Sequence, residues 1–189
     1  ARVSCLVGEK GVGKTVIACQ KALSLADGDT KKLFYISLDD TMFADDTMYD
    51  LAHLAEQHGV KVIVFDEVHR YADWKNDLKR IADRLSVLSI ISGSSILSFK
   101  DLGGLARRMV KYHLHGMTLR EYLAMRYNLI ITPMTLDEIT SGNRSTLSEI
   151  AKLIQEKTQK PLSLLFAEYL RRGYYAYGTA SISDTEFST

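Results

Sequence analysis

Short apolar runs alternate with longer amphipathic stretches over the first half of the chain. Four runs are apolar at nearly every position, which is typical of strands buried on both faces of a parallel sheet. These runs cover residues 3–7, 33–38, 61–65 and 87–91. The stretches between them predict helices over 14–26, 47–58 and 77–85. This alternation predicts an α/β fold of right-handed βαβ units, with helices on both faces of a parallel sheet.

The pattern changes after residue 97, where helical periodicity replaces the alternation. Residues 109–114 predict one more strand. Thr118 and Glu121 have the spacing of a capping box, as do Thr146 and Glu149, and each box predicts a helix start. A last helix is expected over 162–171, after Pro161 breaks the preceding run. We therefore predict a core over residues 1–117, a helical lid or extension over 118–177 and a disordered tail over 178–189.

Composition is that of an ordinary globular protein. Of 189 residues, 46% are hydrophobic and 25% are charged, and the net charge of +1 favours neither nucleic-acid nor membrane binding. Cys5 and Cys19 lie in predicted buried elements, as expected of small core residues in a reducing compartment. No signal peptide or membrane-spanning run is evident, so a cytoplasmic location is expected. The chain opens at Ala1, just before the first predicted strand, so we expect a fragment of a longer polypeptide.

A glycine-rich loop lies between the first predicted strand and the first predicted helix. Its residues match the phosphate-binding pattern Gly-x-x-x-x-Gly-Lys-[Ser/Thr]. They are Gly8, Glu9, Lys10, Gly11, Val12, Gly13, Lys14 and Thr15, and with Val16 they form the expected nucleotide-binding set. In this context backbone N–H groups and the positive end of the helix dipole surround a triphosphate. Lys14 is expected to reach the β- and γ-phosphates, and the Thr15 hydroxyl to ligate Mg²⁺.

An acidic pair follows the third predicted strand. Asp66 is expected to hold Mg²⁺ through water, and Glu67 to orient and deprotonate an attacking water. Small-molecule kinases have no need of such a glutamate, because their acceptor is not water. The pair therefore favours a hydrolase.

Three further groups are candidates for supporting roles. If the fourth strand inserts between the first and the third, Ser94 or Ser95 in the predicted 92–95 turn lies beside the γ-phosphate and can position water. Arg107 and Arg108 are candidate arginine fingers, acting in their own site or in that of a neighbour. Asp66 to His69 also spells a helicase-style acidic box, but other helicase elements are missing, which favours a structural hydrogen-bonding role for His69.

With these residues placed, the chain resembles a family of bacterial and archaeal AAA+-type ATPases. That family is related to the signal-transducing STAND ATPases and carries a C-terminal domain of unassigned function. The resemblance rests on residues 12–15, 35–40, 65–74, 92–95, 105–108, 119–123 and 166–174. Two departures are present: residues 16–18 replace a usual threonine and leucines, and no arginine lies beside Gly104 where the finger would be expected.

The resemblance implies a P-loop ATPase core whose five parallel strands have the order 5-1-4-3-2. It assigns Lys14 and Thr15 to the Walker A motif, Asp66 and Glu67 to the Walker B motif, and Ser94 or Ser95 to the sensor. It also implies ATP and Mg²⁺ as ligands and places the C-terminal domain outside this chain. Adenine rather than guanine follows from the resemblance, and the chain contains no Asn-Lys-x-Asp motif.

The leading hypothesis is an ATP-hydrolysing switch that alternates between ATP- and ADP-bound states. Turnover is expected to be slow in isolation, because an arginine from a partner is worth about 10³–10⁵ in rate. Residues 27–50 carry a net charge of −5 and residues 100–126 a net charge of +4, so self-association of opposite patches is one alternative to two solvated faces. A DNA-associated ATPase using the 100–126 segment and a nucleotide-gated module with negligible hydrolysis are the other hypotheses. No membrane partner is expected.

Overall fold

The computed structural model describes residues 2–40, 46–94, 102–141 and 144–179. The chain divides into two compact units, residues 1–115 and 116–189, each of which is described by itself. Of the predicted 178–189 tail, residues 180–189 lie outside the described ranges, as does Ser95.

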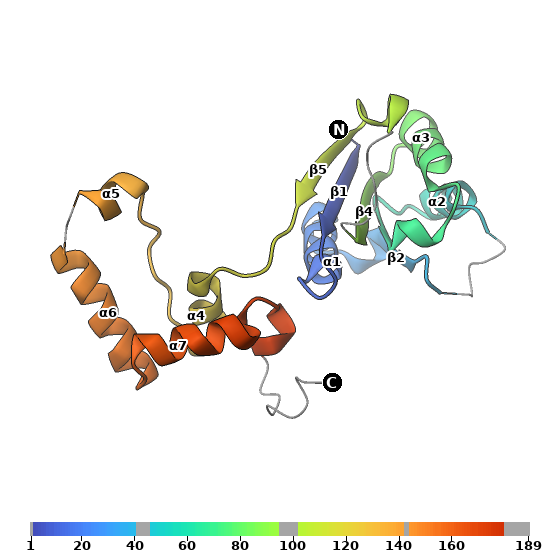
Figure 1. The fold of residues 1–189 in the computed structure, drawn as a ribbon. Helices are drawn as coiled ribbons and strands as arrows, with labels where there is room; N and C mark the ends of the chain where they lie inside the picture. The colour runs from blue at the N-terminus through green and yellow to red at the C-terminus, as the bar shows by residue number, and fades with distance from the viewer. Residues whose placement is uncertain (1, 41–45, 95–101, 142–143, 180–189) are drawn as a thin grey trace. The chain divides into compact units, whose positions relative to one another are not determined.

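Five parallel strands form the sheet of the first unit (Figure 1). They are β1 (Val3–Gly8), β2 (Leu33–Ser37), β3 (Val62–Asp66), β4 (Leu88–Ser94) and β5 (Met109–His113). Their order is β2-β3-β4-β1-β5, and every neighbouring pair is parallel. The predicted order 5-1-4-3-2 and the predicted α/β class are confirmed. All five residues of β3 are buried, as expected of a strand covered on both faces.

Helices cover both faces of this sheet (Figure 1). On one face α1 (Lys14–Leu25) presents Ala18 and Ala22, whose small side chains let it approach Val62, Val64 and Ile90 closely. On the other face α2 (Met48–Gln57) and α3 (Trp74–Arg84) pack against residues such as Phe65 and Ile91. The two layers bury the centre of the sheet, whereas the edge strand β5 is mostly exposed. Because all five strands are parallel, their carboxyl ends lie at one edge of the sheet, called here the carboxyl edge.

Two element boundaries differ from those predicted. The turn expected at 92–95 is wrong for 92–94, because β4 continues to Ser94 in a parallel ladder with β1, where Leu6 pairs with Ser92 and Gly8 with Ser94. Helix α3 begins at Trp74 rather than at Asp77, because the Trp74 side chain is buried with the helix's apolar stripe. Short 3₁₀ turns connect the elements: η1 (Thr30–Lys32), η3 (Val68–Arg70) and η4 (Gly103–Leu105).

The second unit is helical. Its elements are α4 (Leu119–Tyr127), α5 (Leu136–Thr140), α6 (Arg144–Thr158), α7 (Leu162–Glu168), a π-helical turn η5 (Tyr169–Gly173) and a 3₁₀ turn η6 (Ala176–Thr179). Its core contains Tyr122, Leu123, Leu129, Ile154 and Leu165. No helix in the part of the chain that the structure describes is long and apolar enough to cross a membrane.

Capping boxes start two of these helices. The box of Thr118 and Glu121 opens α4 as predicted. The predicted start at Thr146 is wrong, because α6 already begins at Arg144 and Thr146 lies inside it. Thr135 and Glu138 form a second box, at α5, that the sequence reading did not identify.

Candidate phosphate-binding and metal-binding site

Glycines shape the loop between β1 and α1. Gly11 and Gly13 have φ angles of 88° and 96°, in the left-handed region that favours glycine. Gly8 has a different reason: a Cβ at this position would clash with the carbonyl oxygen of Leu114, the residue after β5. The loop can therefore take this path only with glycine at all three positions.

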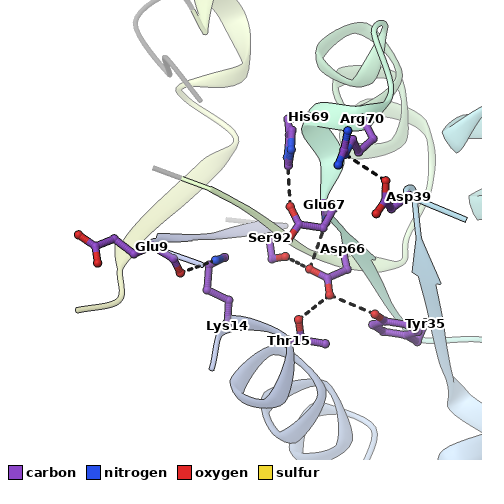
Figure 2. Close-up of polar contacts among 10 residues, drawn as sticks. All are labelled: Glu9, Lys14, Thr15, Tyr35, Asp39, Asp66, Glu67, His69, Arg70 and Ser92. Atoms are coloured by element: carbon purple, nitrogen blue, oxygen red, sulfur yellow. Dashed lines mark hydrogen bonds and ion pairs between the residues drawn. The ribbon is translucent and has the colours of Figure 1, made fainter. Parts of the chain in front are cut away.

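The loop leads directly into the amino terminus of α1. Gly13 is the helix N-cap, and the Ile17 N–H donates to its carbonyl oxygen at 3.0 Å. Lys14 is only 6% exposed, and its Nζ donates to the Glu9 carbonyl oxygen at 2.8 Å (Figure 2). Buried ammonium, free helical N–H groups and the helix dipole all favour an anion here. Of the other predicted loop residues, Glu9, Lys10 and Val16 are exposed and Val12 is buried.

Asp66 lies at the centre of the site, at the end of β3. It is 4% exposed and accepts hydrogen bonds from three side-chain hydroxyls (Figure 2). Thr15 Oγ1 donates to Asp66 Oδ2 at 2.6 Å, and the Tyr35 hydroxyl donates to the same oxygen at 3.0 Å. Ser92 Oγ donates to Asp66 Oδ1. Burial, followed by the nearby Asp66 charge, raises the pKa of Tyr35 to about 12, so this phenol stays a donor at neutral pH.

The oxygens of Thr15 and Asp66 fit a magnesium ion. Hydroxyl and carboxylate oxygens are the hard ligands that Mg²⁺ prefers, and Mg²⁺ is usually held by one or two protein groups together with water and phosphate oxygens. No cluster of three or more His, Cys, Asp or Glu side chains that could hold a metal ion lies among the described residues. The structure brings Thr15 and Asp66, the two predicted magnesium ligands, within hydrogen-bonding distance of each other.

Glu67 follows Asp66 in an unusual backbone conformation. Its φ and ψ angles are 53° and 43°, a left-handed conformation that is uncommon for residues other than glycine. Its Oε2 lies 3.2 Å from His69 Nδ1, and this nitrogen is buried without a well-aligned hydrogen bond. His69 therefore approaches the predicted general base, which the sequence reading did not anticipate.

The loop after Glu67 is held to the two neighbouring helices. Asp77 of α3 is 2% exposed and accepts from the Tyr71 hydroxyl and from Arg80, both at 3.0 Å. It also accepts from the Tyr49 N–H of α2 at 3.3 Å. Arg70 forms a second anchor, with its Nε 3.0 Å from Asp39 at the end of β2.

The predicted sensor serines lie at the limit of the described chain. Ser94 ends β4 beside Gly8, the first loop residue, in the ladder with β1. Its side chain, like the whole of Ser95, lies outside the described part, so the sensor role stays a prediction. The contact between Ser92 and Asp66 was not predicted. The available signal was a serine that directly follows the apolar residues Ile90 and Ile91.

The structure does not bring the predicted arginine fingers to the loop. Arg107 and Arg108 precede β5, and the Val3 N–H donates to the Arg108 carbonyl oxygen. They therefore lie at the amino ends of the parallel strands, at the edge opposite the carboxyl edge. Arg108 is bound to Asp83 of α3, with 3.0 Å between Nη2 and Oδ2, and the Arg108 guanidinium lowers the pKa of Asp83. Arg107 is exposed and has no ion pair within the described ranges.

Known proteins are similar to this chain in sequence and in architecture. Residues 1–123 match the family model described as an AAA domain. An uncharacterized protein of Methanocaldococcus jannaschii is 25% identical over 172 residues, which cover 84% of this chain and 36% of that protein. The solved structure of C. elegans PCH-2 has a TM-score of 0.57 at 18% identity, covering 100% of this chain and 55% of that chain. The chain thus spans only part of the length of either protein.

The match with the AAA domain extends over well more than half of the chain and includes every residue around Asp66 described above. The likeness to PCH-2 independently supports the fold. The chain belongs to the AAA domain family and carries a nucleotide-binding domain of the ATPase type.

Proposed function

We propose that this chain binds ATP with Mg²⁺, hydrolyses it, and acts as a nucleotide-driven switch. The observation that carries the proposal is the 2.6 Å hydrogen bond between Thr15 and the buried Asp66. It brings the phosphate loop of β1 and α1 to the acidic pair of β3, and Lys14 lies next to Thr15 on the same helical turn. A triphosphate bound by the loop would therefore meet a cation, two metal-ligating oxygens and a carboxylate base.

Each of these residues has a separate task in the proposed reaction. The loop N–H groups and Lys14 bind and orient the phosphates. Thr15 and Asp66 would hold Mg²⁺, which neutralises charge on the β- and γ-phosphate oxygens when bound. Glu67 accepts a proton from the attacking water as that water bonds to the γ-phosphorus, and ADP leaves with the electrons of the broken P–O bond. Tyr35 and Ser92 hold Asp66 in place and do not contact the reacting atoms.

The switch is supported by the way the segment after Glu67 is anchored. Glu67 is in a left-handed conformation, and η3 follows it at once. Tyr71 then binds the buried Asp77, which also accepts from the backbone of α2. A change of Glu67 between ATP- and ADP-bound states would therefore reach α2 and α3 through a short, hydrogen-bonded path.

The location of Arg107 favours action in a neighbouring molecule. It is exposed at the amino edge of the sheet, whereas the phosphate loop lies at the carboxyl edge of the same molecule. We infer that an arginine finger, if this chain supplies one, is Arg107 acting in trans, while Arg108 keeps its ion pair with Asp83. DNA association stays a prediction.

The test is phosphate release from MgATP by the wild type, Lys14→Ala and Glu67→Gln, with ATP binding measured in parallel by calorimetry. We expect Lys14→Ala to lose binding. Glu67→Gln should keep binding and lose about 10²–10⁴-fold in release, since it removes the base alone. If all three proteins release phosphate at the same background rate while the wild type still binds ATP, hydrolysis is rejected and a nucleotide-gated module takes its place.

A further inference from the structure

Strand β5 forms one edge of the sheet, and β1 is its single neighbouring strand in the part of the chain that the structure describes (Figure 1). At its two ends, the Arg108 carbonyl oxygen accepts a hydrogen bond from β1 and the Leu114 N–H donates one to β1. Along a parallel strand, every second residue turns its N–H and C=O groups toward the same neighbour. The backbone groups of Met109 and His113, which alternate with these, therefore face the open side of the sheet.

The side chains of β5 are also exposed on the face of the sheet that α1 covers elsewhere. Val110 is 41% exposed and Tyr112 is 53% exposed. The small side chains of Ala18 and Ala22 bring α1 close to β3 and β4, so the helix covers the middle of the sheet and stops short of β5. An open backbone edge and an uncovered row of side chains therefore coincide at this strand.

A cavity of about 460 Å³ lies beside α1 on the same face. Its lining is mostly apolar and comes from β1, α1, β4 and the β5 region. A chain added along β5 would direct every second side chain toward this face. Apolar side chains in that row would cover Tyr112 and reach into the cavity. The apolar lining consists of Leu6, Ile17, Ile90, Tyr112 and Leu114.

The charge around β5 favours an acidic partner. The two basic residues of α1 and the three basic residues of the segment 102–115 are accompanied by no acidic residue in either segment. Lys21 lines the cavity. Lys111 is exposed and belongs to the opposite face of β5, because side chains alternate along a strand. If the apolar side chains of an added strand faced the cavity, acidic ones between them would lie on the same face as Lys111.

The other edge of the sheet has the opposite charge. β2 follows Asp29 and precedes Asp39 and Asp40. An acidic strand would meet like charges there, so charge selects β5 between the two edge strands. Pairing of β5 with the β5 of a second copy is disfavoured for a related reason, because it would bring the bases of the two edges together.

We propose that β5 is a docking edge for a partner protein, which adds to it an extended segment of alternating apolar and acidic residues. Hydrogen bonds to the outward backbone groups of β5 hold the segment, and its side-chain pattern gives specificity. Its apolar side chains cover Tyr112, and its acidic side chains lie beside Lys111. The apolar cavity and the open backbone edge favour a protein strand over a nucleic acid, whose phosphates would need a groove of cations.

The experiment uses a fluorescein-labelled peptide in which valine and glutamate alternate over about eight residues, a common strand length. Its binding to the full chain is followed by fluorescence anisotropy, and a peptide with lysine in place of glutamate is the charge control. Tyr112→Ala is compared with Leu54→Ala, because Leu54 is 54% exposed and lies on α2, away from β5. Lys111→Glu is compared with Lys152→Glu, an exposed lysine of α6. Circular dichroism verifies that the variants fold.

We expect Tyr112→Ala to weaken peptide binding about tenfold, because it removes the aromatic anchor of the interface. Lys111→Glu should weaken it about fivefold, since it places like charges on facing strands. The two control variants should bind as the wild type does, and the lysine peptide should not bind. No residue of the phosphate loop lines the cavity, so these expectations hold whether or not the chain binds ATP.

Hydrogen exchange measured by NMR gives a second readout, which distinguishes an added strand from contact with side chains alone. The peptide should protect the amides of Met109 and His113, which face the open side. The amides of Val110 and Tyr112 should change little, because the alternation directs them toward β1.

Four outcomes would overturn the inference. The first is no binding of the glutamate peptide by the wild type up to about 1 mM. The second is an equal loss of binding in Tyr112→Ala and Leu54→Ala, or no protection of the outward amides, which would place the peptide elsewhere. Tighter binding of an oligothymidylate than of the peptide, lost in Tyr112→Ala, would assign the edge to nucleic acid. Dimerisation seen by light scattering and lost in Tyr112→Ala would assign it to a second copy.

Discussion

Three elements of the fold meet at Asp66, and each contributes one side-chain hydroxyl group. Thr15 comes from α1, Tyr35 from β2 and Ser92 from β4, and each donates to the same carboxylate. These donors differ in burial, because Ser92 is 0% exposed and Tyr35 is 39% exposed. A lost hydrogen bond is costlier where water cannot replace it, so the two supporting hydroxyls should not be equivalent.

At this scale we predict that Ser92→Ala lowers the free energy of unfolding by about 1–3 kcal/mol, because it leaves a buried carboxylate oxygen with one donor fewer. Tyr35→Phe should lower it by less, about 0.5–1 kcal/mol. Urea unfolding followed by the fluorescence of Trp74 measures both values, since Trp74 is the single tryptophan and lies in the same unit. A larger loss for Tyr35→Phe than for Ser92→Ala would contradict this order.

Helix starts in the second unit show how one local motif acts in two contexts. Both α4 and α5 begin with a threonine and a glutamate that form a complete capping box. In both, hydrogen bonds from the threonine to the glutamate lower the pKa of Glu121 and of Glu138. Only α4 buries residues of its own, Tyr122 and Leu123, in the core of the unit.

We therefore predict that Thr118→Ala destabilises the whole helical unit by about 1 kcal/mol, the usual effect of losing an N-cap. Hydrogen exchange of core amides in α4, α6 and α7 should rise about fivefold. Thr135→Ala is the matched control, and it should speed exchange only in and near α5, which has no buried residue. If the two substitutions raised hydrogen exchange of the core amides equally, the number of residues that a helix buries would not explain how far the loss of its N-cap spreads.

The first unit separates its phosphate loop from Arg107, an exposed arginine. The loop lies at the carboxyl edge of the sheet and Arg107 at the amino edge, and no side-chain movement can span the length of the strands between them. If Arg107 contributes to hydrolysis, two copies of the chain must meet.

Mixing two variants tests this arrangement. We predict that Lys14→Ala and Arg107→Ala are each inactive alone, with Arg107→Ala reduced about 10³-fold, and that their mixture releases phosphate faster than the sum of the two. The mixture regains a complete site because the Lys14→Ala copy still supplies Arg107. Arg108→Ala serves as the control, because Arg108 is bound to Asp83 rather than offered to a neighbour. This variant should release phosphate by itself, and mixing it with Lys14→Ala should not raise the rate above the sum of the two. A mixture no faster than the sum would exclude a shared site.

Many features of the fold were predictable from neighbouring residues. Glycines at 8, 11 and 13 followed by Lys14 and Thr15 predicted the phosphate loop, since few other residues can take its backbone path. Four apolar runs predicted β1 to β4, residues 109–114 were predicted separately as the fifth strand, and the strand order followed from the resemblance. Boundaries were less predictable: β4 continues to Ser94 because β1 pairs with it, which no local pattern around residues 92–94 indicates.

Sequence alone determined the loop, the acidic pair at the end of β3 and the alternation of strands and helices, because each depends on residue types close together in the chain. Only the tertiary structure decided that Tyr35 and Ser92 also meet Asp66. They are 31 and 26 residues away from it, and they lie on β2 and β4, the two strands that pair with β3. Strand pairing also places Arg107 at the opposite edge, because strand order and register are properties of the whole sheet.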